Sequence, residues 1–351
     1  MADLSGFIKE RLPIDAAGLE HVLSEPIPGH LRRWWFALGG TPAYLFVVQA
    51  VTGILLTFYY VPEPGRSWES VREITDEVAF GWYFRSLHKW AATLMIVAVL
   101  LHAMRVFFTG AYRRPRELSW VVGALVLLLT LFFGFTGYSL IYEQLSFWGA
   151  TVAANLTEQV PLIGPLLAKF LRGGETVGDN TITRFFVIHI GVLPTALTLL
   201  LGVHILLVRL HGVAPLAFEA DKKSGEAERT FPFFPDHFLT EVMIGVALMV
   251  LLTALALVFP AEMGERANPL VTPAHIKPEW YFLFTFRWLK LVGLHTAVLS
   301  LGFLAFLFVI WPLCDRLIRA RRRDSEASVW IGALTVVAIV ALTLWEALAH
   351  P

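Results

Sequence analysis

Long apolar runs alternate with short polar segments over most of the 351-residue chain. Seven of these runs are long enough to cross about 30 Å of hydrocarbon as helices that rise about 1.5 Å per residue. The pattern therefore predicts an all-α integral membrane protein with seven transmembrane helices, four in a first group and three in a second. The predicted spans are residues 34–60, 80–109, 117–141, 182–210, 239–259, 297–315 and 328–348.

Two other apolar stretches are too short or too interrupted to span. Residues 280–292 contain Arg287 and Lys290, which indicates an interfacial or re-entrant helix. Residues 160–171 contain two prolines and predict a surface helix between the third and fourth spans. Residues 1–25 have neither an apolar core nor a small-residue cleavage site, so we expect no removable signal peptide and assign 1–33 as an N-terminal cytoplasmic segment.

Composition agrees with a membrane setting and excludes several functions. Hydrophobic residues make up 56% of the chain and charged residues 16%, against about 25% charged in a soluble domain. A net charge of zero argues against a nucleic-acid partner. The single cysteine, Cys314, excludes a disulfide framework and an iron–sulfur cluster held by this chain, and we interpret it as a small apolar helix residue.

Basic residues predict the orientation of the spans. The basic loops all fall on one side together with the N-terminus, and the positive-inside rule makes that side cytoplasmic. Spans two and four then both run inward, and the C-terminus lies outside. The residues that set this orientation are Arg113, Arg114 and Arg116, then Lys222 and Lys223, then Arg319, Arg321, Arg322 and Arg323.

The second and fourth spans each carry two histidines, His88 with His102 and His189 with His204. A neutral imidazole is the usual axial ligand of haem iron, and two per iron favour electron transfer. Because the two spans are parallel, His88 and His189 lie at the same depth near the outer face, and His102 and His204 lie at the same depth near the inner face. These are therefore the two predicted pairs. The intervals of 14 and 15 residues correspond to roughly 21 to 22 Å of helix rise, enough for one haem in each leaflet. One such histidine alone would be an ordinary packed polar side chain, but four at matched depth favour two b haems.

Glycines and arginines near these histidines fit the same interpretation. Two glycine pairs, each 14 residues apart, lie in the first and third spans, where a flat porphyrin requires backbone without side chains. Ordinary close helix packing is the alternative explanation for such small residues. Arginines beside the histidines can pair with the anionic propionates of haem. The alternative explanation for these arginines is that their side chains snorkel toward the membrane surface. The glycines are Gly39, Gly53, Gly123 and Gly137; the arginines are Arg85 for the outer haem and Arg105 and Arg209 for the inner haem.

Sequence segments along nearly the whole chain resemble the cytochrome b/b6 family, the membrane core of quinol-oxidising cytochrome bc and bf complexes. The four histidines fall on the haem-ligand positions of that family. The segments that carry the resemblance are FIKERLPIDA, FALGGTPAYLFVVQAVTG, FRSLHKW, LLHAMRVFFTG, RRPRELSWVVG, TGYSL, LSFWGATV, TITRFFVIHIGVLP and NPLVTPAHIKPEWYFLF.

The resemblance is mixed between two types of the family. The 15-residue interval, the N-terminal segment and the lack of an eighth span resemble the photosynthetic type, whose four-helix and three-helix parts are separate chains. Here one chain carries both, as a b6-like domain over 34–215 and a subunit IV-like domain over 216–351. HIKPEWYFLF resembles the respiratory type instead. The chain therefore resembles a bacterial fused form.

Two positions depart from the family pattern. Ala37 stands where the photosynthetic type has the cysteine that holds a further haem c, so we expect no covalently attached haem c. Ile141 and Tyr142 replace the usual Pro-Trp after the Gly-Tyr-x-Leu segment, which predicts a changed outer quinone pocket.

The resemblance implies a dihaem cytochrome b subunit that oxidises quinol at the outer face. One electron would pass to a Rieske iron–sulfur protein and the other through both haems to an inner quinone site, coupled to proton translocation. Glu279 of the PEWY motif would accept a proton and Tyr281 would position the quinol. Further outer-pocket residues would be Pro278, Trp280 and Gly149; inner-site candidates are His211 and Asp236, with Arg209, Lys222 and His237 on the same side.

The implied partners are a cytochrome c or a multihaem cytochrome, quinone, lipid and a second copy of the complex, in a bacterial cytoplasmic membrane. The kind of quinone stays open. Two alternatives remain: a dihaem anchor that links a peripheral dehydrogenase to quinone, and a haem-free transporter with a histidine proton relay. Only the bc-type reading requires the PEWY motif.

Overall fold

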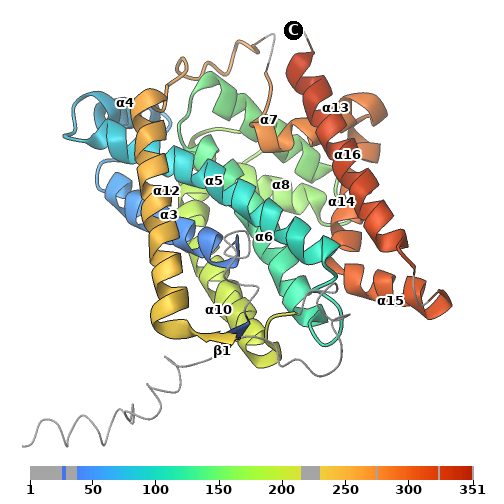
Figure 1. The fold of residues 1–351 in the computed structure, drawn as a ribbon. Helices are drawn as coiled ribbons and strands as arrows, with labels where there is room; N and C mark the ends of the chain where they lie inside the picture. Colours follow the sequence, from blue (N-terminus) through green and yellow to red (C-terminus); the bar gives the residue numbers. More distant parts are fainter. Residues whose placement is uncertain (1–25, 29–37, 215–229, 274–275, 323–324, 350–351) are drawn as a thin grey trace, which may run out of the picture.

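The computed structural model describes residues 26–28, 38–214, 230–273, 276–322 and 325–349. The N-terminal segment up to residue 25, Ala37, Lys222, Lys223 and Arg323 lie outside these ranges. Nearly all described elements are helices, in agreement with the predicted all-α membrane fold (Figure 1).

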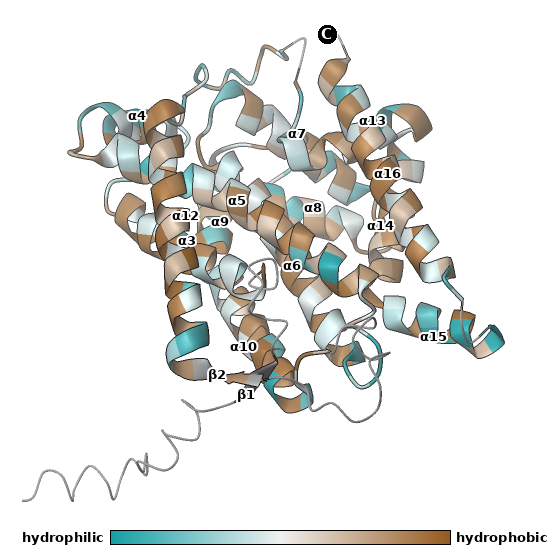
Figure 2. Cartoon of the chain, viewed as in Figure 1, coloured by the Kyte–Doolittle hydropathy of each residue, from teal (hydrophilic) through white to brown (hydrophobic). Residues whose placement is uncertain are grey.

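Within the described ranges, six helical segments are long and apolar enough to cross a membrane, or seven if a pair of helices bent by 71° is counted as one span. Brown, apolar residues cover these long helices in Figure 2, as lipid exposure requires. The spanning segments are α3 (Gly40–Thr57), α5 (Gly81–Phe108), α6 (Glu117–Ser139), the continuous run of α9 (Asp179–Val187), η3 (Ile188–Val192) and α10 (Leu193–His211), α12 (Phe238–Val258), α14 (Leu294–Val309) with α15 (Trp311–Arg321), and α16 (Ala327–Leu348).

The predicted sixth span, 297–315, is wrong at its inner end. The helix begins at Leu294, stops at Val309, and the chain turns by 71° into α15. Pro312 in the first turn of α15 lacks an N–H and disfavours continuation of α14. The charged residues of α15 therefore lie on a helix that turns away from the direction of α14.

The shorter helices lie at the ends of the bundle. The surface helix expected within 160–171 is α8 (Gly164–Arg172), and the interrupted stretch 280–292 forms η5 (Trp280–Phe282) and α13 (Leu283–Val292). Helix α7 (Gln144–Glu158) was not anticipated, and α4 (Ser67–Asp76) follows the first span. At the opposite end, β1 (Pro26–Pro28) pairs antiparallel with β2 (Thr230–Pro232), followed by the short π-helix η4 (Phe233–His237).

We call the end that carries η5 and α7 the PEWY end, and the end that carries β1 and β2 the strand end (Figure 1). The core lies where α3, α5, α6 and α12 pack together, and α10 packs against α6 beside it. Small and branched apolar side chains fill it, including Leu45, Leu87, Ala91, Met95, Ala98, Val99, Leu127, Leu252 and Ala256.

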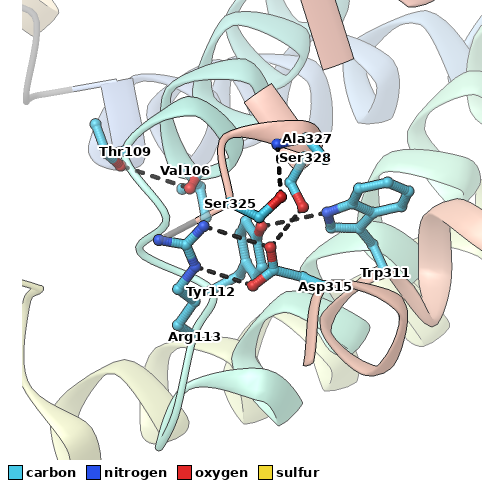
Figure 3. A network of polar contacts seen from close by, with 9 residues as sticks. All are labelled: Val106, Thr109, Tyr112, Arg113, Trp311, Asp315, Ser325, Ala327 and Ser328. Atoms are coloured by element: carbon cyan, nitrogen blue, oxygen red, sulfur yellow. Dashed lines mark hydrogen bonds and ion pairs between the residues drawn. The ribbon is translucent and has the colours of Figure 1, made fainter. Parts of the chain in front are cut away.

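A buried polar network joins the first four spans to the last ones at the strand end (Figure 3). Asp315 of α15 is only 2% exposed and accepts hydrogen bonds from Arg113 Nε at 3.0 Å and from Ser328 Oγ at 2.5 Å. Trp311 donates to the Tyr112 hydroxyl at 3.2 Å. Because a buried carboxylate is stable only with such donors, this network fixes α15 across the end of the bundle.

Candidate functional site

The four histidines form two facing pairs inside the bundle. The ring centres of His88 and His189 are 6.5 Å apart, and those of His102 and His204 are 6.4 Å apart. An iron between two imidazoles, bonded at about 2 Å with about 1 Å from each nitrogen to its ring centre, requires ring centres about 6 Å apart. Both pairs therefore have the separation of a bis-histidine iron site.

The rest of the ligand set also suits haem. Among the described residues, no group of three or more His, Cys, Asp or Glu side chains is placed to hold a metal ion. Two imidazoles alone are a poor site for a bare ion, whereas haem iron brings its own equatorial ligands and needs only two from the protein. The histidines thus fit the cofactor that the sequence predicts.

Hydrogen bonds orient the pair at the PEWY end. The Thr52 hydroxyl lies 2.9 Å from His88 Nδ1, and the Thr136 hydroxyl lies 3.0 Å from His189 Nδ1. Each hydroxyl donates its single proton to a backbone carbonyl one turn earlier, at 2.7 Å and 3.0 Å. A hydroxyl that donates to its carbonyl accepts from Nδ1–H, and this arrangement leaves the lone pair of each Nε2 for a metal.

At the strand end the environment of the rings differs. His102 Nδ1 is buried and has no hydrogen-bond partner within the described ranges. The glycine that faces His102 is Gly39, and the residue before it is Leu38, where Gly53 and Gly137 each have a threonine. The threonine contact is therefore a feature of the PEWY-end pair alone.

A π-helical turn explains why one histidine interval is a residue longer than the other. His189 lies in η3, which continues directly into α10. Pro194, in the first turn of α10, cannot donate to the carbonyl of the preceding turn, which favours a wider turn at this point. The extra residue of a π-turn is absorbed here, so His204 returns to the same face as His189.

Each of the four glycines lies against one of the four histidine rings. An added Cβ at Gly137 would lie 2.7 Å from His189 Cε1, and one at Gly123 would lie 3.0 Å from His204 Cε1. An added Cβ at Gly53 would lie 3.2 Å from His88 Cε1, and one at Gly39 would lie 3.7 Å from His102 Cε1. The glycines therefore admit the imidazoles between the helices, a role more specific than general helix packing.

The arginines are placed less simply. The Arg85 guanidinium is buried and donates to the carbonyls of Ala261 at 2.7 Å and Glu262 at 2.8 Å, and to the Thr75 hydroxyl at 3.1 Å. Much of its donor capacity thus holds the chain beyond α12. Arg105 is half-buried and Arg209 is exposed. Their pairing with propionates stays a prediction.

The PEWY segment lies beside the first histidine pair. An added Cβ at Gly134 would be 2.7 Å from the Tyr281 hydroxyl, so this side chain reaches α6 one turn from Gly137. Burial raises the pKa of Glu279; the Lys89 charge opposes that increase and the Glu143 charge adds to it. Burial and the Glu279 charge likewise raise the pKa of Tyr281. A carboxyl with a raised pKa in such a place is well suited to accept a proton.

The remaining predicted pocket residues surround this segment. Trp280 packs edge-on against Tyr281, with ring centres 5.5 Å apart. An added Cβ at Gly149 of α7 would lie 3.7 Å from Cε1 of the Tyr138 ring. Pro278 is half-buried.

The segment that departs from the family pattern connects this pocket to the loop after α12. Tyr142 has a positive φ of 57° and accepts a hydrogen bond from the Ala267 amide at 3.1 Å. The buried Glu143 carboxylate accepts a hydrogen bond from the Gly264 amide at 2.6 Å. The changed residues thus form a turn held by residues 264–267, and they place a second carboxylate near Glu279.

The predicted inner-site residues gather at the strand end. His237 Nε2 lies 3.6 Å from a carboxylate oxygen of Glu241, one turn later. Glu241 also lies against Gly40, at the start of α3. His211 Nδ1 is bonded to the Leu207 carbonyl at 2.9 Å, so this ring is held against its own helix. Asp236 lies next to His237 in η4.

Sequence reasoning missed four residues of these sites: Thr52, Thr136, Glu143 and Glu241. A signal existed for the threonines, because Thr-Gly occurs at 52–53 and again at 136–137, in front of the two glycines of the PEWY-end pair. Glu241 also had a signal, as an acid four residues after His237 in the first turn of an apolar span. Glu143 had none, because its partner is distant in the chain.

These features define an integral membrane helical bundle with two facing histidine pairs, one near each end, as in membrane cytochromes that hold haem between helices. The chain belongs to the cytochrome b/b6 family. The family model "Cytochrome b/b6/petB" matches residues 22–212, and "Cytochrome b(C-terminal)/b6/petD" matches residues 266–350.

Known proteins agree with this assignment. The chain is 39% identical over 290 residues to a cytochrome bc complex cytochrome b subunit from Chlorobaculum thiosulfatiphilum, covering 82% of this chain and 67% of that protein. It is 41% identical over 208 residues to cytochrome b6 from Heliomicrobium gestii, covering 59% of this chain and 98% of that protein. A solved structure titled "Hyperthermophilic respiratory Complex III" superposes with a TM-score of 0.84 at 27% identity, over 99% of this chain and 92% of that one. The chain is thus a cytochrome b of the bc type, a component of an electron-transport oxidoreductase.

Proposed function

We propose that this chain is the dihaem subunit of a complex that oxidises quinol at the PEWY end and bifurcates its two electrons. The observation that carries the proposal is the position of Glu279 and Tyr281 beside one of two histidine pairs that lie near opposite ends of the membrane bundle. One electron leaves for a Rieske iron–sulfur protein, and the other crosses the membrane to a second quinone site.

Two non-covalent b haems are held by His88 with His189 and by His102 with His204. The haems, when bound, supply one-electron carriers in line across the membrane. The glycines opposite each ring admit the imidazoles, and Thr52 and Thr136 keep two of them in the metal-binding tautomer. With alanine at position 37, we propose no covalently attached haem c.

At the PEWY end, Glu279 accepts one quinol proton and Tyr281 positions the ring. The raised pKa of Glu279 matches this role, because a weakly acidic carboxyl can both take a proton from the site and release it to water. Pro278, Trp280 and Gly149 shape the pocket. The neighbouring Glu143 is held in place by the Gly264 amide.

At the strand end, we propose a second quinone site near His237, Glu241 and Asp236. The imidazole and carboxylate, 3.6 Å apart, can bond a quinone carbonyl and deliver a proton to it. Arg209 and His211 lie on the same side. Proton release at one end and uptake at the other would make the oxidation electrogenic.

The orientation and the partners follow from the same proposal. The strand end, with the α5–α6 connection and basic α15, faces the cytoplasm under the positive-inside rule. The chain then lies in a bacterial cytoplasmic membrane with its N-terminus inside. Its partners are a Rieske protein and a cytochrome c or multihaem cytochrome, in a dimeric complex.

The test is a rapid-mixing experiment on the purified complex with quinol present. If electrons bifurcate, a pulse of strong oxidant reduces the b haems, because removal of the first electron drives the second one into this chain. We expect a transient rise in reduced b absorbance. A dihaem dehydrogenase anchor gives only haem oxidation on the same pulse, and a haem-free transporter gives no b absorbance; either result would refute the proposal.

The glycine distances predict a graded effect of added methyl groups. Gly137→Ala places a Cβ within 2.7 Å of the His189 ring, and Gly39→Ala places one at an ordinary 3.7 Å from the His102 ring. We expect Gly137→Ala to broaden or lose the low-spin haem spectrum of one site and Gly39→Ala to retain both. Low-temperature absorbance and electron paramagnetic resonance measure this. Equal effects of the two substitutions would contradict the proposed packing.

A further inference from the structure

The last spanning helix ends in a charge cluster that no proposed step uses. Glu346, two residues before the last residue of α16, is 0% exposed. Its carboxylate lies 2.6 Å from Lys290 Nζ and 3.5 Å from Arg287 Nη1, both on α13. The Arg287 guanidinium also stacks over the Trp345 ring at 3.7 Å. A carboxylate this deeply buried is retained only with close cationic partners.

A second contact joins the same two parts of the chain. Lys277 Nζ donates to the backbone carbonyls of Glu346 and Ala349, both at 2.9 Å. These carbonyls belong to the last turn of α16, where helical partners are missing and a cation is favoured. Lys277 therefore caps the C-terminus of α16.

The two contacts bracket the PEWY motif. Lys277 immediately precedes Pro278, and α13 with Arg287 and Lys290 follows η5 without a break. The motif is therefore held to one helix end from both sides. Its residues contact α16 through η5 as well, and the Trp288 indole donates to Ser300 Oγ of α14 at 2.8 Å.

We propose that Glu346 is a positioning residue for quinol oxidation: through Arg287 and Lys290 it fixes α13 and so the placement of Glu279 and Tyr281 in the pocket. The inference rests on the proposed function of the PEWY end. Glu346 does not touch the quinol, and it acts only through the segment that it anchors. A shift of about 1 Å in such a segment can lower a rate by about 100-fold.

The first test is Glu346→Gln in the purified complex. We expect quinol oxidation to slow about tenfold or more, both b-haem spectra to stay unchanged, and amide hydrogen exchange over residues 277–283 to accelerate. Glu175→Gln is the control, because it removes an ion pair with Lys169 whose glutamate side chain is 82% exposed. Unchanged exchange over 277–283 in Glu346→Gln would overturn the inference.

Combination with Glu279→Gln separates positioning from a general loss of structure. If Glu346 acts through Glu279, then Glu346→Gln slows the Glu279→Gln enzyme by less than about twofold, because the effects of coupled residues do not add. Full additivity of the two losses overturns the positioning role. If Glu279→Gln alone leaves the rate unchanged, the proposed role of the PEWY end in quinol oxidation is refuted. Hydrogen exchange over residues 277–283 then still shows whether Glu346 anchors this segment.

Glu346→Gln leaves two cations without their buried partner, and the protein can fail to accumulate. The double variant Glu346→Gln, Lys290→Met removes one cation with the carboxylate and avoids most of that penalty. We expect it to retain both haems and to show the same faster exchange over 277–283. Native exchange and a native rate in the double variant would likewise refute the inference.

Discussion

Replacing His189 with leucine is expected to remove one of two b haems and to abolish quinol oxidation. Leucine cannot ligate iron, and the remaining His88 alone does not hold a low-spin bis-histidine site. The pyridine haemochrome of the purified chain should fall from about two haems to about one. Thr136→Val is the matched control. It removes the hydroxyl that contacts Nδ1 and the Phe132 carbonyl but leaves the iron ligand in place, so it should retain both haems and alter the midpoint potential of one.

Double variants test the pairing itself. His88 and His189 face one another at 6.5 Å, so losing both should remove the same single haem as losing either. Losing His88 and His102 together should remove both haems, because those two residues belong to different pairs. One haem remaining in the second double variant would contradict the pairing.

Glu279→Gln is expected to slow quinol oxidation by about 10- to 100-fold while both haem spectra stay intact. Glutamine keeps the shape of the side chain and cannot accept the quinol proton. Glu265→Gln provides the control, since Glu265 is an exposed acid on the loop before the motif. A rate equal to that of the native complex would remove Glu279 from the mechanism.

The pH dependence of the rate carries a second signature. Burial raises the pKa of Glu279 above its ordinary value, with Lys89 opposing the increase and Glu143 adding to it. A base acts in its ionised form, so the rate should fall as the pH drops through this raised pKa, at a less acidic pH than for an exposed glutamate. The acidic limb should be absent in Glu279→Gln. A limb that persists in the variant would belong to another group.

Much of the fold could be predicted from local pattern. Span length and hydropathy depend on neighbouring residues only, and five of the seven predicted spans agree with the helices within a few residues. The predicted first span, 34–60, contains the helix Gly40–Thr57, and its first residues lie outside the described ranges. In the predicted sixth span, 297–315, the apolar pattern continues past Val309, but the chain bends by 71°, with Pro312 in the first turn of α15 and Asp315 paired with Arg113. Helix α7 was missed because its polar and apolar residues are mixed over a length too short for a span.

The candidate site likewise combines residues that can be recognised in the sequence with contacts that only the fold creates. Histidines and the PEWY motif are visible as residue types at set intervals. The second carboxylate, Glu143, lies in the pocket only because residues 142–144 pair with residues 264–268. Arg85 has charge suited to a propionate, yet three of its donor contacts go to the chain beyond α12 and to α4.

From the sequence alone follow the membrane class, the two histidine intervals and the motif acid, because hydrophobicity and ligand chemistry belong to individual residues. The tertiary structure decided how these residues meet. It brought the ring centres to 6.5 and 6.4 Å, absorbed the longer interval in a π-turn at His189 and placed one glycine against each ring. It also joined Glu346 to α13. Such contacts depend on helix packing between residues far apart in the chain, which local periodicity does not encode.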